Sequence, residues 1–496
     1  MQQETGSLRQ LALHGTLATA AAQAIRVALQ LLTVILLSRW LKPADFGLVA
    51  MVMPVVALVS LFQDFGLQQA VIQRRAISAA EQTRLFYINL AAALAVIVVL
   101  LILSPLVAAF YRQPQVALLA AAWAVPIALG ALAAQHLALL SREGRFGTLS
   151  AIDVAAAVSG FLVSAGSAFI WRSYWAIWAG TAVAAILTAI FAWRSSGWRP
   201  GSIRTKAETG DLLRFGANVT GFSFLNYLSR SMDAVMIARA YGATALGFYD
   251  RAYRLLLFPI QNINAPVTKV MVPLLSRMNG DPERLRRAFV ETAGLLGLIC
   301  IPGIATVVVV ADEVILLLLG PHWAAVAPIF TWLGIAGLMQ TLSNATGWLF
   351  IAQNRTRELL HWGIYSSITT LLSFAAGLPW GAVGVAAAYA ISGWLVRLPV
   401  LYWVVHRIGP VRMRDLLLLQ LPLTVAAGLL AGVVHGLRMT GLEGIGLILC
   451  SGVLAYAIAL ATLASYADGR AILKAAWRLT RSFRGARAYE EAEIRL

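Results

Sequence analysis

The chain has 496 residues, of which 60% are hydrophobic and only 12% are charged, and its mean hydropathy is +0.77. Soluble globular proteins carry roughly 25% charged residues, so this composition excludes a soluble enzyme or binding domain and indicates an integral membrane protein. The net charge of +17 does not indicate a nucleic-acid partner, because the basic residues are dispersed between apolar segments. The two cysteines, Cys300 and Cys450, have no metal-ligand spacing and are too few for a disulfide framework.

Fourteen apolar segments are long enough to cross a hydrocarbon core of ~30 Å as helices. In chain order they cover residues 14–38, 46–63, 85–110, 117–139, 148–170, 175–194, 214–238, 246–266, 289–311, 323–351, 361–378, 382–405, 414–437 and 443–466. The first has neither a basic region before it nor a cleavage site after it, so we expect it to remain as a membrane helix rather than act as a signal peptide. The pattern predicts an all-α integral membrane protein of about 14 transmembrane helices.

The distribution of basic residues between the predicted loops sets the orientation. With a cytoplasmic N-terminus, 28 of the 39 Lys and Arg residues fall in cytoplasmic loops or the tail, 5 fall in the opposite loops, and 6 lie within spans or at their edges. Cytoplasmic loops are enriched in Lys and Arg, so both termini are predicted to be cytoplasmic. Residues 467–496 form a basic tail, whose charges beside Trp477 and Phe483 either lie on the anionic inner leaflet or simply carry positive-inside charge.

An internal repeat relates the two parts of the chain. The stretch "SRWLKPADFGLVA", which starts at Ser38, aligns with "ARAYGATALGFYD", which starts at Ala238, so that Arg39 matches Arg239 and Gly47 matches Gly247. The offset is six spans, so both copies enter the membrane from the same side and form a parallel repeat with a cavity between two bundles. We expect a six-helix bundle in residues 1–200, a second in 201–410, two additional helices in 411–466, and the basic tail.

Three stretches carry a resemblance to a known family: "SRWLKPADFGLVAM", "LFQDFGLQQAVIQRR" and "LLRFGANVTGFSFLNYLSRSMDAVMIARAYGATALGFYDRAYRLLLFPIQNI". They resemble the polysaccharide flippases of the multidrug/oligosaccharidyl-lipid/polysaccharide exporter superfamily, and within it the Wzx-type transporters for colanic acid, succinoglycan or teichuronic acid repeat units. The resemblance implies that an oligosaccharide on undecaprenyl diphosphate moves from the inner to the outer leaflet of the bacterial plasma membrane, without covalent chemistry or a cofactor. It implies membrane lipids and the polysaccharide polymerase or chain-length machinery as partners, and no nucleic acid.

Charged residues inside apolar spans are the candidate site. A charge at the bilayer centre costs roughly 2.5–3.5 kcal/mol, so such residues must pair, reach the interface or face a wet cavity. The candidates for a cationic substrate cavity are Arg26, Asn226, Arg230, Asp233, Asp250, Arg251, Arg254 and Arg397. Guanidinium groups bind phosphate oxygens bidentately, so this cavity suits the diphosphate of the implied substrate.

A structural ion pair that holds helices together, rather than contact with substrate, is the alternative role for some of these residues. Arg230 and Asp233 are three positions apart and share a helix face, and Asp250 precedes Arg254 by four, which is the favourable order for an ion pair. Arg251 points about 100° away from Asp250 and is expected to have no local partner.

Asp153 is the one deep acid of the first half. It is a candidate proton or sodium site for coupling, and equally a structural partner for Arg26. Arg239, at the edge of its span, is expected to be an interfacial anchor.

Two other functions are compatible with a membrane protein of this kind. A drug/cation antiporter of the same superfamily needs acids in its cavity, whereas the buried charges here are net positive. A membrane polysaccharide polymerase or ligase needs a large outer loop with catalytic residues, and the longest predicted outer loop is the short apolar stretch "DEVILLLLGPHW". The sequence therefore favours a flippase and argues against an enzyme.

Overall fold

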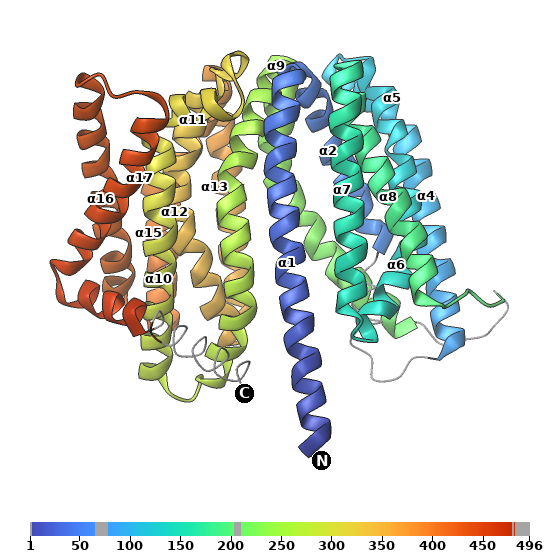
Figure 1. Cartoon of the computed structure of the whole chain (residues 1–496), viewed down its shortest axis with the longest axis horizontal. Coiled ribbons are helices and arrows are strands. Elements are labelled where there is room, and N and C mark those ends of the chain that lie inside the picture. The colour runs from blue at the N-terminus through green and yellow to red at the C-terminus, as the bar shows by residue number, and fades with distance from the viewer. Residues whose placement is uncertain (1, 65–77, 203–209, 479–480, 482–496) are drawn as a thin grey trace, which may run out of the picture. The chain divides into compact units, whose positions relative to one another are not determined.

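The fold was analysed in a computed structural model, which describes residues 2–64, 78–202, 210–478 and 481. Side chains are not described for 2–18, 20, 61–64, 210–230, 259–261, 265 and 408. The described residues form helices and no strand (Figure 1). The chain divides into two compact units, Met1–Gly247 and Phe248–Leu496. The prediction of an all-α membrane protein is confirmed.

The first unit consists of long helices that run side by side. They are α1 (Gln2–Trp40), α2 (Pro43–Asp64), α4 (Ala79–Tyr111), α5 (Gln115–Ala122), α6 (Ala124–Arg142), α7 (Phe146–Trp171), α8 (Trp175–Ser196) and the part of α9 (Gly210–Arg277) that ends at Gly247. Helix α7 packs against α8 and α1, and α4 packs against α2 and α6. Small residues allow the α7–α8 approach: a Cβ on Gly180 would overlap the Ser164 side chain and the Gly160 carbonyl.

Polar groups join the helix ends of this unit. The Asp45 carboxylate accepts hydrogen bonds from the backbone N–H groups of Lys42 and Tyr174, at 3.0 and 3.2 Å. It therefore satisfies the open N-terminus of α2 and ties it to the start of α8. The indole of Trp178 donates to the carbonyl of Ala122 at 3.0 Å, which joins α8 to the end of α5.

Helix α9 contains one break. Gly242 has φ 78° and ψ −171°, a conformation that is open to glycine and strained for other residues. The predicted spans 214–238 and 246–266 lie on either side of this residue. A single glycine therefore stands where the sequence predicted a short loop.

The second unit contains the remaining helices. They are the rest of α9, α10 (Pro282–Val309), α11 (Ala311–Leu318), η1 (Pro321–Trp323), α12 (Val326–Ala352), α13 (Thr356–Gly377), η2 (Leu378–Trp380), α14 (Gly381–Ser392), the π-helix η3 (Gly393–Arg397), α15 (Leu398–Ile408), α16 (Met413–Met439), α17 (Gly444–Ala464) and a helix over residues 467–478. Helix α10 packs against α12, α16 and α17, and α12 also packs against α14. The core of the unit lies along α10 and α12, which bury Phe289, Leu333 and Trp348.

The helices agree broadly with the predicted spans. Eleven segments of the described chain are long and apolar enough to cross a membrane, and one of them, Thr356–Arg407, contains both α13 and α14. The total of fourteen, the six-helix repeat and the predicted domain limits stay predictions. The stretch "DEVILLLLGPHW", predicted as an outer loop, lies between the candidate spans Pro282–Val309 and Val326–Ala352, and α11 and η1 occupy most of it. Its apolar residues have helical spacing, and Ala311, Ile315 and Leu319 are buried on one face.

Candidate functional site

A polar stripe on α1 is the first part of the candidate site. Gln23, Arg26 and Gln30 lie on one face of the helix, since they are separated by three and four positions. All three are exposed. A hydrocarbon surface does not satisfy amide and guanidinium groups, so this stripe requires a polar environment inside the predicted span 14–38.

Arg26 forms an ion pair with Asp153 of α7. The Arg26 Nη1 and Asp153 Oδ2 atoms are 3.2 Å apart, and the two side chains are 49% and 53% exposed. At 1.5 Å per residue, Arg26 lies about 21 Å along α1 from Trp40, well inside a hydrocarbon core of ~30 Å. The structure therefore brings the candidate coupling acid to the candidate cavity arginine, and neither group is enclosed by protein.

In the second unit, Asp250, Arg251 and Arg254 form a triad on α9. Asp250 Oδ2 is 2.9 Å from Arg251 Nη2, and both carboxylate oxygens accept hydrogen bonds from Arg254 Nε at 2.9 Å. The side chains of Asp250 and Arg251 are 17% and 10% exposed, but that of Arg254 is 52% exposed. Two arginines on one carboxylate give the triad a net charge of +1, with the accessible charge on Arg254.

The triad confirms one expectation and corrects another. The Asp250–Arg254 pair was expected from its spacing and is present. Arg251 was expected to have no local partner, and this is wrong. Adjacent Cβ atoms on a helix do diverge by about 100°, but the long arginine side chain turns back to reach the carboxylate.

Other predicted site residues lie elsewhere in the first unit. Asp233 is buried, at 5% exposure, and its Oδ1 atom is 2.7 Å from the backbone nitrogen of Ala234. The side chains of Asn226 and Arg230 lie outside the described residues. Arg239 is exposed, with its guanidinium 5.7 Å from the Phe110 ring centroid, as expected of an interfacial residue.

Arg397 is enclosed within the second unit. It is 5% exposed, and its guanidinium donates to Thr370 Oγ1 at 2.7 Å and to the Tyr389 carbonyl at 2.6 Å. It also lies 4.2 Å from the Tyr389 ring centroid. Its Nε atom has no hydrogen-bond partner, and no described carboxylate lies within ion-pair distance. The expectation of no local acid holds for the described residues, while its place in a substrate cavity stays a prediction.

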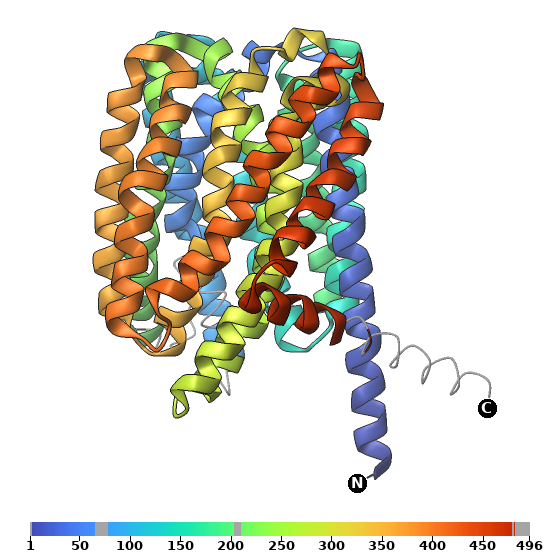
Figure 2. The same ribbon diagram turned by 90° about the vertical axis from the view of Figure 1, so that its left-hand side faces the viewer.

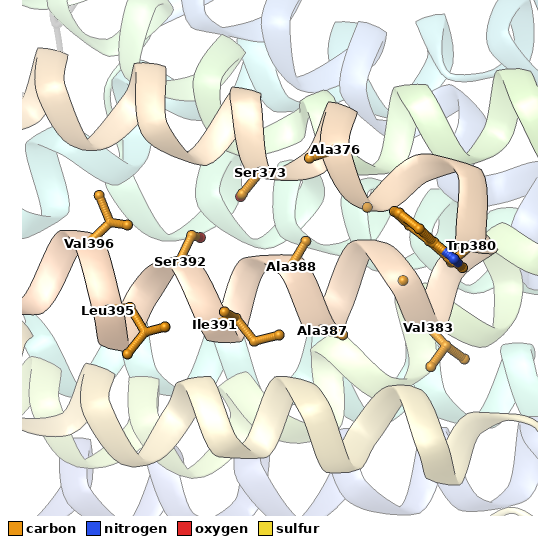
Figure 3. A pocket seen from close by; sticks show the side chains of 12 residues that line it. Ser373, Ala376, Trp380, Val383, Ala387, Ala388, Ile391, Ser392, Leu395 and Val396 are labelled. Atoms are coloured by element: carbon orange, nitrogen blue, oxygen red, sulfur yellow. The ribbon is translucent and has the colours of Figure 1, made fainter.

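An apolar hollow of about 610 Å³ lies between α13 and α14 (Figure 3). Its lining includes the small residues Ser373, Ala388 and Ser392 and the exposed side chains of Trp380 and Leu395. The hollow contains none of the predicted charged residues. Arg397 directly follows the lining residue Val396, but the lining itself has the character of a hydrocarbon-binding surface.

Sequence reasoning missed one buried polar cluster in the first unit. His136 of α6 is fully buried, its Nδ1 atom is 2.7 Å from Ser196 Oγ, and its ring lies 4.3 Å from the Trp193 ring. Its Nε2 atom has no partner. A single histidine in an apolar helix gives no sequence signal of such a site. No group of three metal-ligating residues occurs in the part of the chain that the structure describes.

The fold is similar to that of known transporters. A structure of the lipid II flippase MurJ in an inward closed conformation superposes with a TM-score of 0.68 at 13% identity, over 90% of this chain and 98% of MurJ. An inward-facing multidrug resistance transporter of the MATE family, described as a member of the MOP superfamily, has a TM-score of 0.60 at 15% identity, over 81% of this chain and 98% of that transporter. At these identities the likeness concerns the fold alone.

Sequence relatives lead to a family. The lipopolysaccharide biosynthesis protein WzxC of Escherichia coli (strain K12) is 28% identical over 388 residues, which cover 78% of this chain and 79% of WzxC. The teichuronic acid biosynthesis protein TuaB of Bacillus subtilis (strain 168) is 27% identical over 331 residues, covering 66% and 68%. The family model described as "Polysaccharide biosynthesis protein" matches residues 36–328, more than half of the chain. This match shows that the chain, whose long apolar helices carry the polar groups described above, belongs to the polysaccharide biosynthesis protein family.

Proposed function

We propose that this chain is a flippase that moves a lipid-linked oligosaccharide repeat unit across the bacterial plasma membrane by alternating access. One observation carries the proposal: charged side chains inside predicted spans keep about half of their surface exposed. Arg26 and Asp153 lie within candidate membrane helices of the structure, and Arg254 lies in the predicted span 246–266. Lipid-facing charges of this kind are strongly disfavoured, so these groups face a wet substrate path.

The charge of these groups fits an anionic lipid carrier. The pair in the first unit is neutral, whereas the triad in the second unit has a net charge of +1 and exposes its cation. A guanidinium held at Nε by a carboxylate is fixed in orientation and binds phosphate oxygens in a planar, bidentate manner. Arg254 is therefore the residue that we assign to the diphosphate.

Asp153 is the candidate coupling residue. Because it already pairs with Arg26, proton or sodium binding at Asp153 would compete with that pair. Arg26 would then be released when the ion binds. The release of Arg26 would add a free positive charge to the substrate path each time an ion binds. The candidate ions are H⁺ and Na⁺.

The proposal extends to orientation, sites and partners. Both termini are cytoplasmic by the distribution of basic residues. Undecaprenyl diphosphate carries the sugar, and the polysaccharide polymerase or chain-length machinery receives it on the outer face. Asp233, Arg251 and Arg397 remain candidate cavity residues, to be tested with the others.

The relatives support this function by what their names state. WzxC and TuaB are biosynthesis proteins for surface polysaccharides, and MurJ, which has the same fold, is a flippase for lipid II. The multidrug transporter has the same fold as well. Charge favours the flippase, because a cation exporter requires a net acidic path, whereas the Arg26–Asp153 pair is neutral and the triad has a net charge of +1.

The decisive experiment deletes the gene in its bacterium and follows radiolabelled lipid-linked repeat units. We expect intact units to accumulate on the cytoplasmic face, where externally added reagents cannot modify them, and the plasmid-borne gene to restore export. Accumulation on the outer face would identify a polymerase or ligase defect and contradict the proposal. Unchanged polysaccharide with increased drug sensitivity would support the antiporter instead.

A further inference from the structure

A short helix over residues 467–478, here named the tail helix, follows the last long helix. Helix α17 ends at Ala464, and the chain turns at Ser465 and Tyr466. Gly469 packs on the backbone of Leu463, where a Cβ would overlap the carbonyl group. Figure 2 shows the tail helix (dark red) lying across the lower ends of the long helices of its unit rather than alongside them.

One face of the tail helix is packed on protein. Ile472 and Ala475 are 3% and 5% exposed. Ile472 lies on α10 at Gly294, where an added Cβ would be only 2.7 Å from the Ile472 Cδ1 atom. The glycine thus provides the space that allows the tail helix to lie against α10.

Contacts with two long helices place the tail helix at the boundary between water and hydrocarbon. On α10, Glu291 is the last charged residue before the uncharged run 292–309, and Arg478 pairs with it at 3.3 Å. On α16, Arg414 and Asp415 precede a run without Asp, Glu, Lys or Arg, and the Tyr466 hydroxyl donates to the Leu418 carbonyl at 3.0 Å. Both contacts lie where the charged end of a helix gives way to its apolar part.

The Tyr466 hydroxyl is protonated at physiological pH, as in any tyrosine, and burial moves its pKa further upward. Burial raises the pKa of Tyr466 to about 12, and the nearby carboxylate of Asp468 adds to the effect. The phenol is therefore a hydrogen-bond donor at every physiological pH, and this anchor on α16 persists.

The opposite face of the tail helix is basic and aromatic. Arg470, Lys474, Trp477 and Arg478 are spaced four, three and one positions apart, which places them on one side, and all are exposed. Trp477 is 67% exposed. Leu473, Lys474, Trp477 and Arg478 line a hollow of about 630 Å³. Exposed cations beside an exposed indole at the edge of the hydrocarbon are the composition of an interfacial lipid-binding helix.

We propose that this face, Arg470–Lys474–Trp477–Arg478, binds the headgroups of anionic phospholipids in the membrane that surrounds the protein. The cations attract phosphate and carboxylate groups of the lipid surface, and the indole inserts at headgroup level. The Arg478–Glu291 pair couples this face to α10, so bound lipid stabilises the packing of the tail helix on its unit. With a general excess of positive charge instead, removing two cations elsewhere on the unit would weaken the preference equally.

The test measures quenching of Trp477 fluorescence by brominated lipids in the full-length protein. The Trp477 signal is the difference between the wild type and Trp477→Phe, each in bilayers that contain brominated phosphatidylglycerol or brominated phosphatidylcholine at equal mole fraction. We expect phosphatidylglycerol to quench more strongly. In Arg470→Gln/Lys474→Gln, the mole fraction for half-maximal quenching should rise at least about fivefold.

A matched control and a salt titration complete the test. Arg284→Gln/Arg287→Gln removes the same charge from the exposed start of α10 and should leave the preference unchanged. In the wild type, raising the ionic strength should weaken the preference without any substitution. Equal quenching by both lipids, or an equal loss in the control, would overturn the proposal. No quenching by either lipid would place Trp477 against water or another protein, and would overturn it as well.

Discussion

Gly47 and Gly247, 200 positions apart in the sequence, pack reciprocally in the first unit. A Cβ on Gly47 would overlap the carbonyl oxygen of Ala243, and a Cβ on Gly247 would overlap the carbonyl oxygen of Pro43. Pro43 and Ala243 are themselves 200 positions apart. Pro43 lies four positions before Gly47, and Ala243 lies four positions before Gly247. Each glycine therefore contacts the counterpart of the residue four positions before it, as expected for a local two-fold relationship. The reciprocal contact supports the repeat at this point, while its extension over six helices stays a prediction.

Substitution of either glycine should destabilise the protein. Gly47→Ala and Gly247→Ala each force a methyl group into a backbone carbonyl, and overpacking of this kind costs about 1–3 kcal/mol. Because the two contacts share one crossing, the double variant should lose less than the sum of the single variants. The measurement is the midpoint of thermal unfolding in detergent. Gly166→Ala, at a helical position with no atom near the added Cβ, is the control and should not lower the midpoint.

The Arg26–Asp153 pair should be essential for transport but not for folding. Both side chains are half exposed, so Arg26→Gln leaves no buried charge behind and removes a charge from the substrate path. A charged hydrogen bond to the substrate contributes about 1.5–3 kcal/mol, so we expect export to fall at least about tenfold. An exposed ion pair contributes at most about 1 kcal/mol to folding, so the unfolding midpoint should change little. Arg194→Gln, an exposed arginine at the end of α8, is the control. Wild-type export from Arg26→Gln would contradict the role of this pair.

The sequence predicts the helices well and the contacts between distant residues poorly. Long apolar runs define α4 or α16, because a bilayer leaves few other structures open to them. Asp250 and Arg254 could be paired in advance because four positions form one helical turn. Arg26 and Asp153 are separated by 127 positions, and only the packing of α1 on α7 brings them together. The sequence therefore allows this pairing as one of two roles for Asp153, but it does not decide between the pairing and an ion-coupling site.

Short-range errors have different causes. The segment before Trp323 connects two candidate spans, as predicted, but its helix α11 was not foreseen. Hydropathy alone does not show whether a short apolar run forms a helix, a strand or a loop. Arg251 reaches Asp250 because of side-chain length, which a helical wheel ignores. Arg397 was correctly found to lack a nearby acid, but neutral acceptors, Thr370 and a carbonyl group, hold it in place.

The triad on α9 should separate stability from transport. Asp250→Asn leaves the mostly buried Arg251 without its carboxylate, and loss of one member of a buried pair costs about 3–5 kcal/mol. We expect a large fall in the unfolding midpoint and in the amount of protein in the membrane. Arg254→Gln should fold normally, because this side chain is half exposed, but should accumulate lipid-linked repeat units on the cytoplasmic face. Equal effects of the two substitutions on stability would show that Arg254 is a structural residue.

A bidentate ion pair should hold α16 on α10. Asp415 accepts hydrogen bonds from Arg286 Nε and Nη2 at 2.7 and 2.6 Å and from the backbone N–H of Arg412 at 2.8 Å, and its side chain is only 9% exposed. Asp415→Asn should therefore lower the unfolding midpoint by a destabilisation of about 3 kcal/mol. Arg286→Met/Asp415→Leu should recover part of this loss, since neither charge remains, but not the hydrogen bond to Arg412. The exposed Arg414, one position away, is the control: Arg414→Gln should have no effect. An Asp415→Asn variant as stable as the wild type would mean that apolar packing alone joins these helices.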